Sequence, residues 1–126
     1  MTAPLTITQR NVGRVVILEL LGRLIFDEDG DRLLRAQVAS LIAAGEHNIL
    51  LDLSGVKQMD SGGVGTLVAV YLHALKRGGR LKLLRPSERV NRVLHMTHLE
   101  SAFEVFESEN DAVRTFDVVR SIGVRS

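Results

Sequence analysis

The fold of this chain is decided by the stretch from Asn48 to Gly65, which reads NILLDLSGVKQMDSGGVG. Its first part, residues 48–53, is short and almost wholly apolar, which is typical of a buried strand in a parallel sheet. Residues 54–60 read as a loop, and residues 64–75 are apolar at almost every position, which predicts a heavily covered helix. A buried strand that leads through a loop into a covered helix is the repeating unit of a parallel α/β sheet.

The residues before this stretch predict a hairpin and a helix. Two apolar runs on either side of a turn at Asn11-Val12-Gly13 indicate a pair of antiparallel strands, and Gly22 is expected to end the second one. An acidic cluster follows, and negative charges suit the amino-terminal end of a helix. Gly45 is a fitting stop for that helix. Its apolar stripe consists of Leu33, Leu34, Val38, Leu41 and Ile42.

The residues after the stretch predict two more strands and two more helices. Gly78-Gly79 ends the covered helix, and residues 81–84 form a further strand. Pro86-Ser87 opens the next helix, residues 103–106 form a short fifth strand, and Ser108 with Asp111 resembles a capping box for a last helix. The expected order is therefore β-β-α-β-α-β-α-β-α. It describes one α/β domain with a mixed, mostly parallel sheet of four or five strands and about four helices, over residues 5–118, followed by a frayed tail at residues 119–126.

The composition fits a single domain of the soluble class. The chain has 126 residues, of which 45% are hydrophobic and 25% charged, and a domain of this size needs no metal or disulfide for stability. The absence of cysteine excludes disulfides, thiolate metal sites and cysteine nucleophiles. A formal net charge of +1 is too small for an overall attraction to nucleic acid or an anionic membrane. Because no apolar run is long enough to cross a bilayer and the N-terminus does not read as a signal peptide, we expect a cytoplasmic protein.

The loop before the covered helix is the most informative part of the sequence. In a parallel α/β sheet, ligands and partners meet the carboxyl ends of the strands, which here means residues 54–65. Ser61 lies where a helix N-cap belongs, and its oxygen is expected to accept from an amide near Gly63 or Val64. The adjacent glycines leave its hydroxyl uncovered and permit close backbone approach. A serine at this place is a good phosphate acceptor, but serines that only cap a helix far outnumber regulated ones.

The run Leu51-Asp52-Leu53-Ser54-Gly55-Val56 followed by Met59-Asp60-Ser61-Gly62-Gly63-Val64-Gly65 resembles the signature of STAS domains, in particular the bacterial anti-sigma factor antagonists. The resemblance covers about residues 5–118. It includes Gly22 at the family's strand-ending glycine, Gly78-Gly79 with Leu81 at its next loop and strand, and a C-terminal helix and strand carrying Val90, Val93, Leu94, Thr97, Leu99, Phe103, Val105 and Phe106.

This resemblance implies a regulated protein-interaction module that is not an enzyme and uses no cofactor or metal. In the family, the serine corresponding to Ser61 is phosphorylated by a partner that is both a serine kinase and an anti-sigma factor. The unphosphorylated antagonist binds that partner and frees the sigma factor, and a PP2C-type phosphatase resets the switch. The implied partner-binding residues are Asp27, Asp60, Ser61, Gly62, Gly63, Val64 and Gly65. A monomer or weak dimer without membrane span or nucleic-acid partner is expected.

Two positions depart from the family pattern. Gly62 replaces the second serine or threonine that commonly follows the phosphoacceptor. Arg23 stands where many antagonists carry glutamate, and the segment Leu24-Ile25-Phe26-Asp27 is one residue longer than usual, although Asp27 remains a candidate contact.

Other chemistries fit the sequence less well. Asp52 at a strand end resembles the phosphoacceptor of receiver domains, but the acidic pair and late lysine of those domains are missing, so a structural acceptor is favoured. No Gly-Lys-Ser/Thr follows the glycines, which argues against a Walker loop. His73 lies twelve residues after Ser61, about 18 Å along a helix at ~1.5 Å per residue, and cannot serve as its base. His95 and His98 lack a third metal ligand.

Three further alternatives remain open from the sequence. The domain is also compatible with an unphosphorylated STAS subunit of an ABC lipid transporter or of a stress-sensing assembly, and with a small-ligand or nucleotide binder at the same loop.

Residues 76–92 hold seven basic side chains against Glu88, without stacking aromatics between them, which favours a solvated face over a nucleic-acid site. Docking of an acidic protein surface is the second interpretation of this segment.

Overall fold

The computed structural model describes residues 3–125, and side chains through residue 117. The elements follow the predicted order, with one short 3-10 turn added. They are β1 (Thr6–Val12), β2 (Val15–Leu24), α1 (Asp29–Ala43), β3 (Asn48–Met59), α2 (Ser61–Lys76), β4 (Arg80–Leu84), α3 (Glu88–Met96), η1 (Glu100–Ala102), β5 (Val105–Phe106) and α4 (Glu109–Arg125). Among residues 3–125, no helix combines the length and apolarity needed to cross a bilayer.

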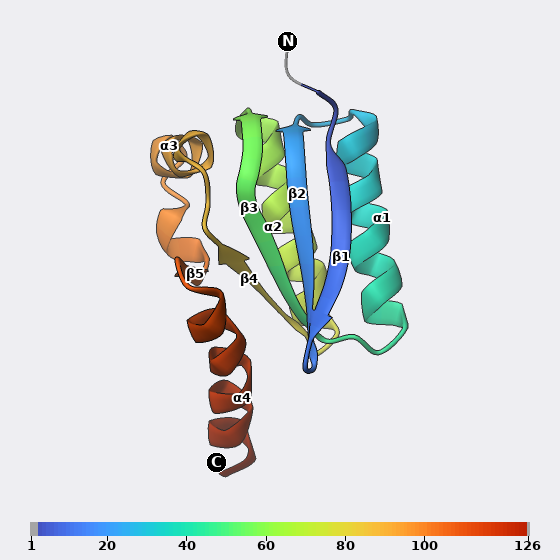
Figure 1. The fold of residues 1–126 in the computed structure, drawn as a ribbon, viewed down its shortest axis with the longest axis vertical. Helices are drawn as coiled ribbons and strands as arrows, with labels where there is room; N and C mark the ends of the chain where they lie inside the picture. Colours follow the sequence, from blue (N-terminus) through green and yellow to red (C-terminus); the bar gives the residue numbers. More distant parts are fainter. Residues whose placement is uncertain (1–2, 126) are drawn as a thin grey trace.

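The strands form one mixed sheet in the order β1-β2-β3-β4-β5. β1 and β2 pair antiparallel, whereas β2–β3, β3–β4 and β4–β5 are all parallel, which confirms the predicted arrangement. The carboxyl ends of β2 and β3 lie together at one end of the molecule, at the top of Figure 1. The β1–β2 turn and the connection from α1 to β3 lie at the opposite end of the sheet.

Both faces of the sheet are covered, and each face has its own apolar core. The larger core joins the sheet to α1, α2 and α3, with Leu51, Leu67 and Leu83 among its fully buried members. The smaller core joins the other face to α4 through Ala112 and Phe116, which pack against β2, β3 and β4. Because β3 is buried on both faces, its apolar run at residues 48–53 is explained by its central place.

The predicted loop at residues 54–60 is wrong over most of its length. β3 continues to Met59, and its second half pairs with the end of β2, from Leu21 opposite Gly55 to Leu24 opposite Met59. Val56 and Met59 are buried, while Lys57 and Gln58 between them are exposed. This half reads as a loop because one of its faces is polar, and two register shifts with β2 break the alternation that would identify a strand.

Gly22 lies inside β2 and does not end it, which corrects a second prediction. Its φ of +118° falls in the region that side chains rarely adopt, and a Cβ there would lie 2.4 Å from the Pro4 carbonyl oxygen. The glycine therefore serves a bulge where the segment before β1 passes close by. The hairpin turn also differs by one residue: Val12 pairs with Val15, so the turn consists of Gly13 and Arg14.

The prediction of a frayed tail falls on residues 119–126, whose side chains lie outside the described ones. The backbone of α4 is helical as far as Arg125. Fraying of this segment stays a prediction.

Candidate functional site

The candidate site is the end of the sheet where β2 and β3 lead into α1 and α2. We call residues 25–28 and 60–65 the carboxyl edge. The last paired residues of the two strands, Leu24 and Met59, lie opposite one another and hold the two following segments together. The predicted phosphoacceptor Ser61 and the predicted contact Asp27 therefore belong to one surface, although they are 34 positions apart in the sequence.

Asp60, and not Ser61, caps α2. The backbone of Asp60 is extended, and its Oδ1 accepts a hydrogen bond of 2.8 Å from the amide of Gly63. Ser61 is the first residue of the helix itself. The prediction that Ser61 is the N-cap is wrong by one position, because aspartate and serine are comparable caps and spacing alone does not separate neighbours.

The shift of the cap leaves the Ser61 hydroxyl free of the role that an N-cap oxygen performs. Ser61 is exposed, and its hydroxyl has no hydrogen-bond partner among the described residues. It lies at the amino-terminal end of a 16-residue helix, where free amides and the helix dipole favour added negative charge. This hydroxyl is therefore accessible to a modifying enzyme, and a phosphate on it fits the helix terminus electrostatically.

Gly62 and Gly63 accommodate neighbouring parts of the same chain. A Cβ on Gly63 would lie 2.3 Å from the Leu24 carbonyl oxygen, and a Cβ on Gly62 would lie 2.5 Å from Cβ of Phe26. Gly63 is buried and Val64 is only 1% exposed, so these two residues of the predicted partner-binding set support the surface from within. Gly65 is exposed, and a Cβ there would meet no atom within 4 Å.

Phe26 is a member of this surface that the sequence predictions missed. Its side chain is 58% exposed although it is a large aromatic, and its Cβ occupies the space beside Gly62. The guanidinium carbon of Arg35 lies 5.9 Å from the centre of its ring, within cation–π range. Because the Phe26 Cβ lies where a side chain of residue 62 would begin, this position favours glycine over the serine or threonine that the family resemblance implies. The signal in the sequence was an aromatic in the segment that is one residue longer than the family pattern.

Asp27 is held in an unusual backbone conformation. Its φ is +67°, a left-handed value that is uncommon for a residue with a side chain. Its amide donates to Oδ2 of Asp31 at 2.7 Å, and its exposed carboxylate pairs with Arg32 at 2.9 Å. Asp27 lies on the carboxyl edge, where its role as a partner contact stays a prediction, and its bond to Asp31 fixes its backbone orientation.

Asp31 joins the two halves of the carboxyl edge. It is 2% exposed, and its Oδ1 accepts hydrogen bonds from the Thr66 hydroxyl at 2.6 Å and from Nε of Arg35 at 2.9 Å. The Thr66 oxygen also lies 3.2 Å from the carbonyl oxygen of Gly62, in the first turn of α2. Through these bonds the first turn of α1 is tied to the first turn of α2, which carries Ser61.

The bonds to Asp31 set its ionisation. Burial by itself raises the pKa of Asp31, but the hydrogen bonds from Thr66, from the Asp27 amide and from Arg35, with the charge of Arg35, outweigh burial and lower the pKa below its usual value. The carboxylate is therefore charged at neutral pH although it is buried. The sequence placed Asp31 only as a favourable charge for the helix dipole, since its partner Thr66 lies 35 positions away.

Asp52 is a structural acceptor, as predicted. Its Oδ1 accepts from the amide and hydroxyl of Ser54 at 3.0 and 2.8 Å, and its Oδ2 pairs with Arg85 at 2.9 Å. The residue is 5% exposed and lies within β3. The pairing with Arg85 was not predicted, because Arg85 was counted with the basic face.

The remaining residues that the sequence singled out lie away from the carboxyl edge. His73 is near the end of α2, and His95 lies with its Nδ1 3.6 Å from a carboxylate oxygen of Glu100. Lys82, which was counted with the solvated basic face, is 1% exposed. Its ammonium lies 4.5 Å from the centre of the Phe116 ring, donates to the Thr115 hydroxyl at 2.9 Å, and fixes α4 to the sheet.

Comparison with known proteins gives a consistent assignment. The STAS domain model matches residues 6–112. The TM1081 homolog of Thermotoga neapolitana, named an anti-sigma factor antagonist, is 35% identical over 69 residues, which are 55% of this chain and 61% of that protein. The anti-sigma F factor antagonist of Paenibacillus polymyxa is 27% identical over 106 residues, which are 83% of this chain and 89% of that protein. The match thus spans less than two thirds of the Thermotoga protein's length.

Solved structures give the same result for the fold. The unphosphorylated form of the anti-sigma factor antagonist SpoIIAA has a TM-score of 0.73 and 27% identity, and the match covers 92% of this chain and 97% of SpoIIAA. The phosphorylated form of the Bacillus SpoIIAA has a TM-score of 0.69 with 24% identity, over 88% of this chain and 99% of the other.

Proposed function

Because this chain belongs to the STAS domain family, we propose that it is an anti-sigma factor antagonist whose carboxyl edge binds an anti-sigma factor and whose Ser61 is the phosphorylation switch. The proposal is supported by the names of the relatives and by one observation in particular. The Ser61 hydroxyl is exposed at the first position of a long helix, and the capping bond is made by Asp60 instead. Modification of Ser61 therefore alters the surface without removing a bond that the fold needs.

In the unmodified state the carboxyl edge carries a small neutral hydroxyl, an exposed aromatic ring and exposed carboxylates. Phe26 provides apolar contact area, and Asp27 and Asp60 provide negative charge. Aromatic side chains are enriched at the centres of interfaces, because a large apolar area becomes buried at low entropic cost. This composition suits a partner that presents an apolar pocket with basic side chains around it.

Phosphorylation of Ser61 is expected to abolish this contact. A phosphate adds roughly −1.5 to −2 charges at neutral pH. It would stand next to the exposed carboxylate of Asp60 and close to the acidic residues of the β2–α1 segment. The free amides at the start of α2 stabilise the phosphate in the free protein, whereas an interface built around a neutral hydroxyl loses its fit. The modification thus changes binding much more than folding.

This function requires two enzymes acting on the chain. The proposed partner is a serine kinase that is also the anti-sigma factor, and a PP2C-type phosphatase returns Ser61 to the neutral state. Such a role would place the chain in the cytoplasm with the transcription machinery. If the chain instead bound a transporter ATPase and carried no phosphate on Ser61, the result would favour a STAS subunit of a transporter.

The proposal is tested by incubating the purified chain with its cognate serine kinase and with ATP. We expect one phosphate, located at Ser61 by mass spectrometry of the digested protein. Ser61→Ala should take up none, whereas Ser40→Ala, which removes an exposed serine from the last turn of α1, should be labelled like the unaltered chain. A phosphate on another residue, or equal labelling of Ser61→Ala, would overturn the assignment.

A further inference from the structure

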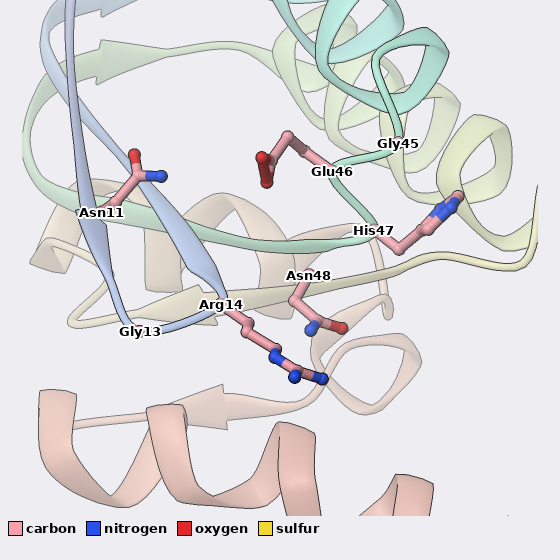
Figure 2. Close-up of a pocket in the computed structure, with 7 residues that line it drawn as sticks. All are labelled: Asn11, Gly13, Arg14, Gly45, Glu46, His47 and Asn48. Atoms are coloured by element: carbon pink, nitrogen blue, oxygen red, sulfur yellow. The ribbon is translucent and has the colours of Figure 1, made fainter.

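A second candidate site lies at the end of the sheet opposite Ser61. Here a cavity of about 350 Å³ opens between the β1–β2 turn and the segment that joins α1 to β3. Its lining residues are Asn11, Gly13, Arg14, Gly45, Glu46, His47 and Asn48, and Figure 2 shows their arrangement. β3 begins at this cavity and ends before Ser61, and the eleven steps along its twelve residues separate the two sites by roughly 36 Å at ~3.3 Å per residue.

The two turns that border the cavity leave it open. Gly13 and Gly45 both have positive φ values, of 59° and 90°, and a Cβ on either would meet no atom within 4 Å. The turns therefore bend sharply with no side chain at their tips. Solvent or a ligand has access to the polar side chains between them.

Asn48 is the observation that points to a ligand. It is only 8% exposed, yet its side-chain amide makes no hydrogen bond to any described residue. No fully buried polar side-chain atom in the described part of the chain lacks a partner, so the amide of Asn48 must be reached from the cavity. Buried polar groups are normally paired, so an amide with two donors and an acceptor left over is available to a polar group that enters the cavity.

The charged residues around Asn48 are also unpaired. Arg14 and Glu46 both line the cavity, yet neither forms an ion pair with the other or with another described residue, although eight other arginines of this chain are paired with carboxylates or with a carbonyl oxygen. In Figure 2 the side chains of Asn11 and Glu46 point toward one another, while those of Arg14 and Asn48 extend in the same direction. The cavity thus offers a cation, a carboxylate and two carboxamides, all without partners.

We propose that this cavity binds a short peptide with free termini, of two or three residues. Arg14 suits the terminal carboxylate, because a guanidinium donates two parallel hydrogen bonds to it. Glu46 suits the terminal ammonium, and the amides of Asn11 and Asn48 match the donor and acceptor of a peptide group. Arg14 and Glu46 do not pair with one another, so both charges remain available to a ligand, and the cavity of about 350 Å³ has room for one longer than a single amino acid. The inference does not rest on the function proposed for Ser61.

The experiment is a titration of the ¹⁵N-labelled full chain with L-alanyl-L-alanine, followed by NMR. Chemical-shift changes are expected at the amides of Gly13 and Gly45 and at the side-chain amide of Asn48, with saturation in the millimolar range or below. Arg14→Gln and Glu46→Gln should each weaken the affinity at least tenfold. Both residues are at the surface, so the variants should fold. The matched controls are Arg77→Gln and Glu107→Gln, which remove exposed charges outside the cavity and should leave the affinity unchanged.

Modified peptides assign the two charges separately. N-acetyl-alanyl-alanine lacks the ammonium, so acetylation should weaken binding to the unaltered chain but cause no further loss in Glu46→Gln. Alanyl-alaninamide lacks the carboxylate and should behave in the same way toward Arg14→Gln. The absence of shifts around the cavity, equal binding of free L-alanine, or affinities that neither variant changes would overturn the proposal.

Discussion

Replacing Thr66 with valine tests the bond that joins the two halves of the carboxyl edge. Valine keeps the shape of threonine but lacks the hydroxyl that donates to Asp31 at 2.6 Å. A hydrogen bond to a charged group contributes ~1.5–3 kcal/mol. The new methyl group, fully buried in place of the hydroxyl, returns about 0.8 kcal/mol. The variant should therefore lose about 1–2 kcal/mol of unfolding free energy at pH 7.

The loss should depend on pH in a direction fixed by the ionisation of Asp31. The pKa of this carboxyl is lower in the folded chain than its usual value, so its contribution to stability is present above the unfolded pKa, near pH 4, and is lost as the pH falls through the folded pKa. Without the Thr66 hydroxyl the folded pKa rises. The difference in stability between the two proteins should hence be largest above about pH 5 and should shrink below about pH 4.

Urea unfolding of both proteins at pH 7 and at the lowest pH where both fold measures this difference. At pH 7 the midpoint of Thr66→Val should fall by about 1 M urea. Thr66→Ser is the matched control, because it loses a methyl group but keeps the donor. It should show a loss that is nearly independent of pH. If the loss in Thr66→Val were equal at both pH values, or if Thr66→Ser showed the same pH dependence, the bond to Asp31 would not have the role assigned to it.

Two further predictions concern the start of α2. Gly62→Ala brings a Cβ to 2.5 Å from Phe26 Cβ, about 0.9 Å inside ordinary contact, and should lower the free energy of unfolding by about 1–3 kcal/mol. This loss should largely vanish in a Phe26→Gly background, whereas additive effects of the two substitutions in a double-mutant cycle would refute the contact. Asp60→Ala removes the bond to the Gly63 amide and should lower the melting temperature by about 3–5 °C in calorimetry, for a loss of ~1 kcal/mol, whereas an unchanged value would show that another group caps the helix.

The order of the elements was predictable because it depends on local pattern. The apolar run at residues 48–53 and the apolar helix that follows are each visible within a dozen residues. The second half of β3 was not predictable in this way. It is a strand because the end of β2 lies beside it, and its pairing passes two register shifts that no local pattern records.

The sequence singles out the centre of the candidate site, but it does not predict the surroundings. Ser61 stands out through its neighbours in sequence, but the choice between Ser61 and Asp60 as cap depends on a shift of one residue in where the helix begins. The places of Phe26 and Asp31 depend on contacts with Gly62 and Thr66 that span more than thirty positions. Such contacts are set by tertiary packing, which composition and spacing do not encode.

The most direct test of the proposed switch compares partner binding with stability in the same set of proteins. The dissociation constant for the cognate kinase is measured by calorimetry for the unmodified chain, the Ser61-phosphorylated chain and Ser61→Asp, with Ser40→Asp as control, and the melting temperature of each is recorded. We predict at least hundredfold weaker binding for the phosphorylated chain, about 2.7 kcal/mol, a clear loss for Ser61→Asp, and melting temperatures within about 2 °C of the unmodified chain. Equal dissociation constants for the unmodified and phosphorylated chains would contradict the account.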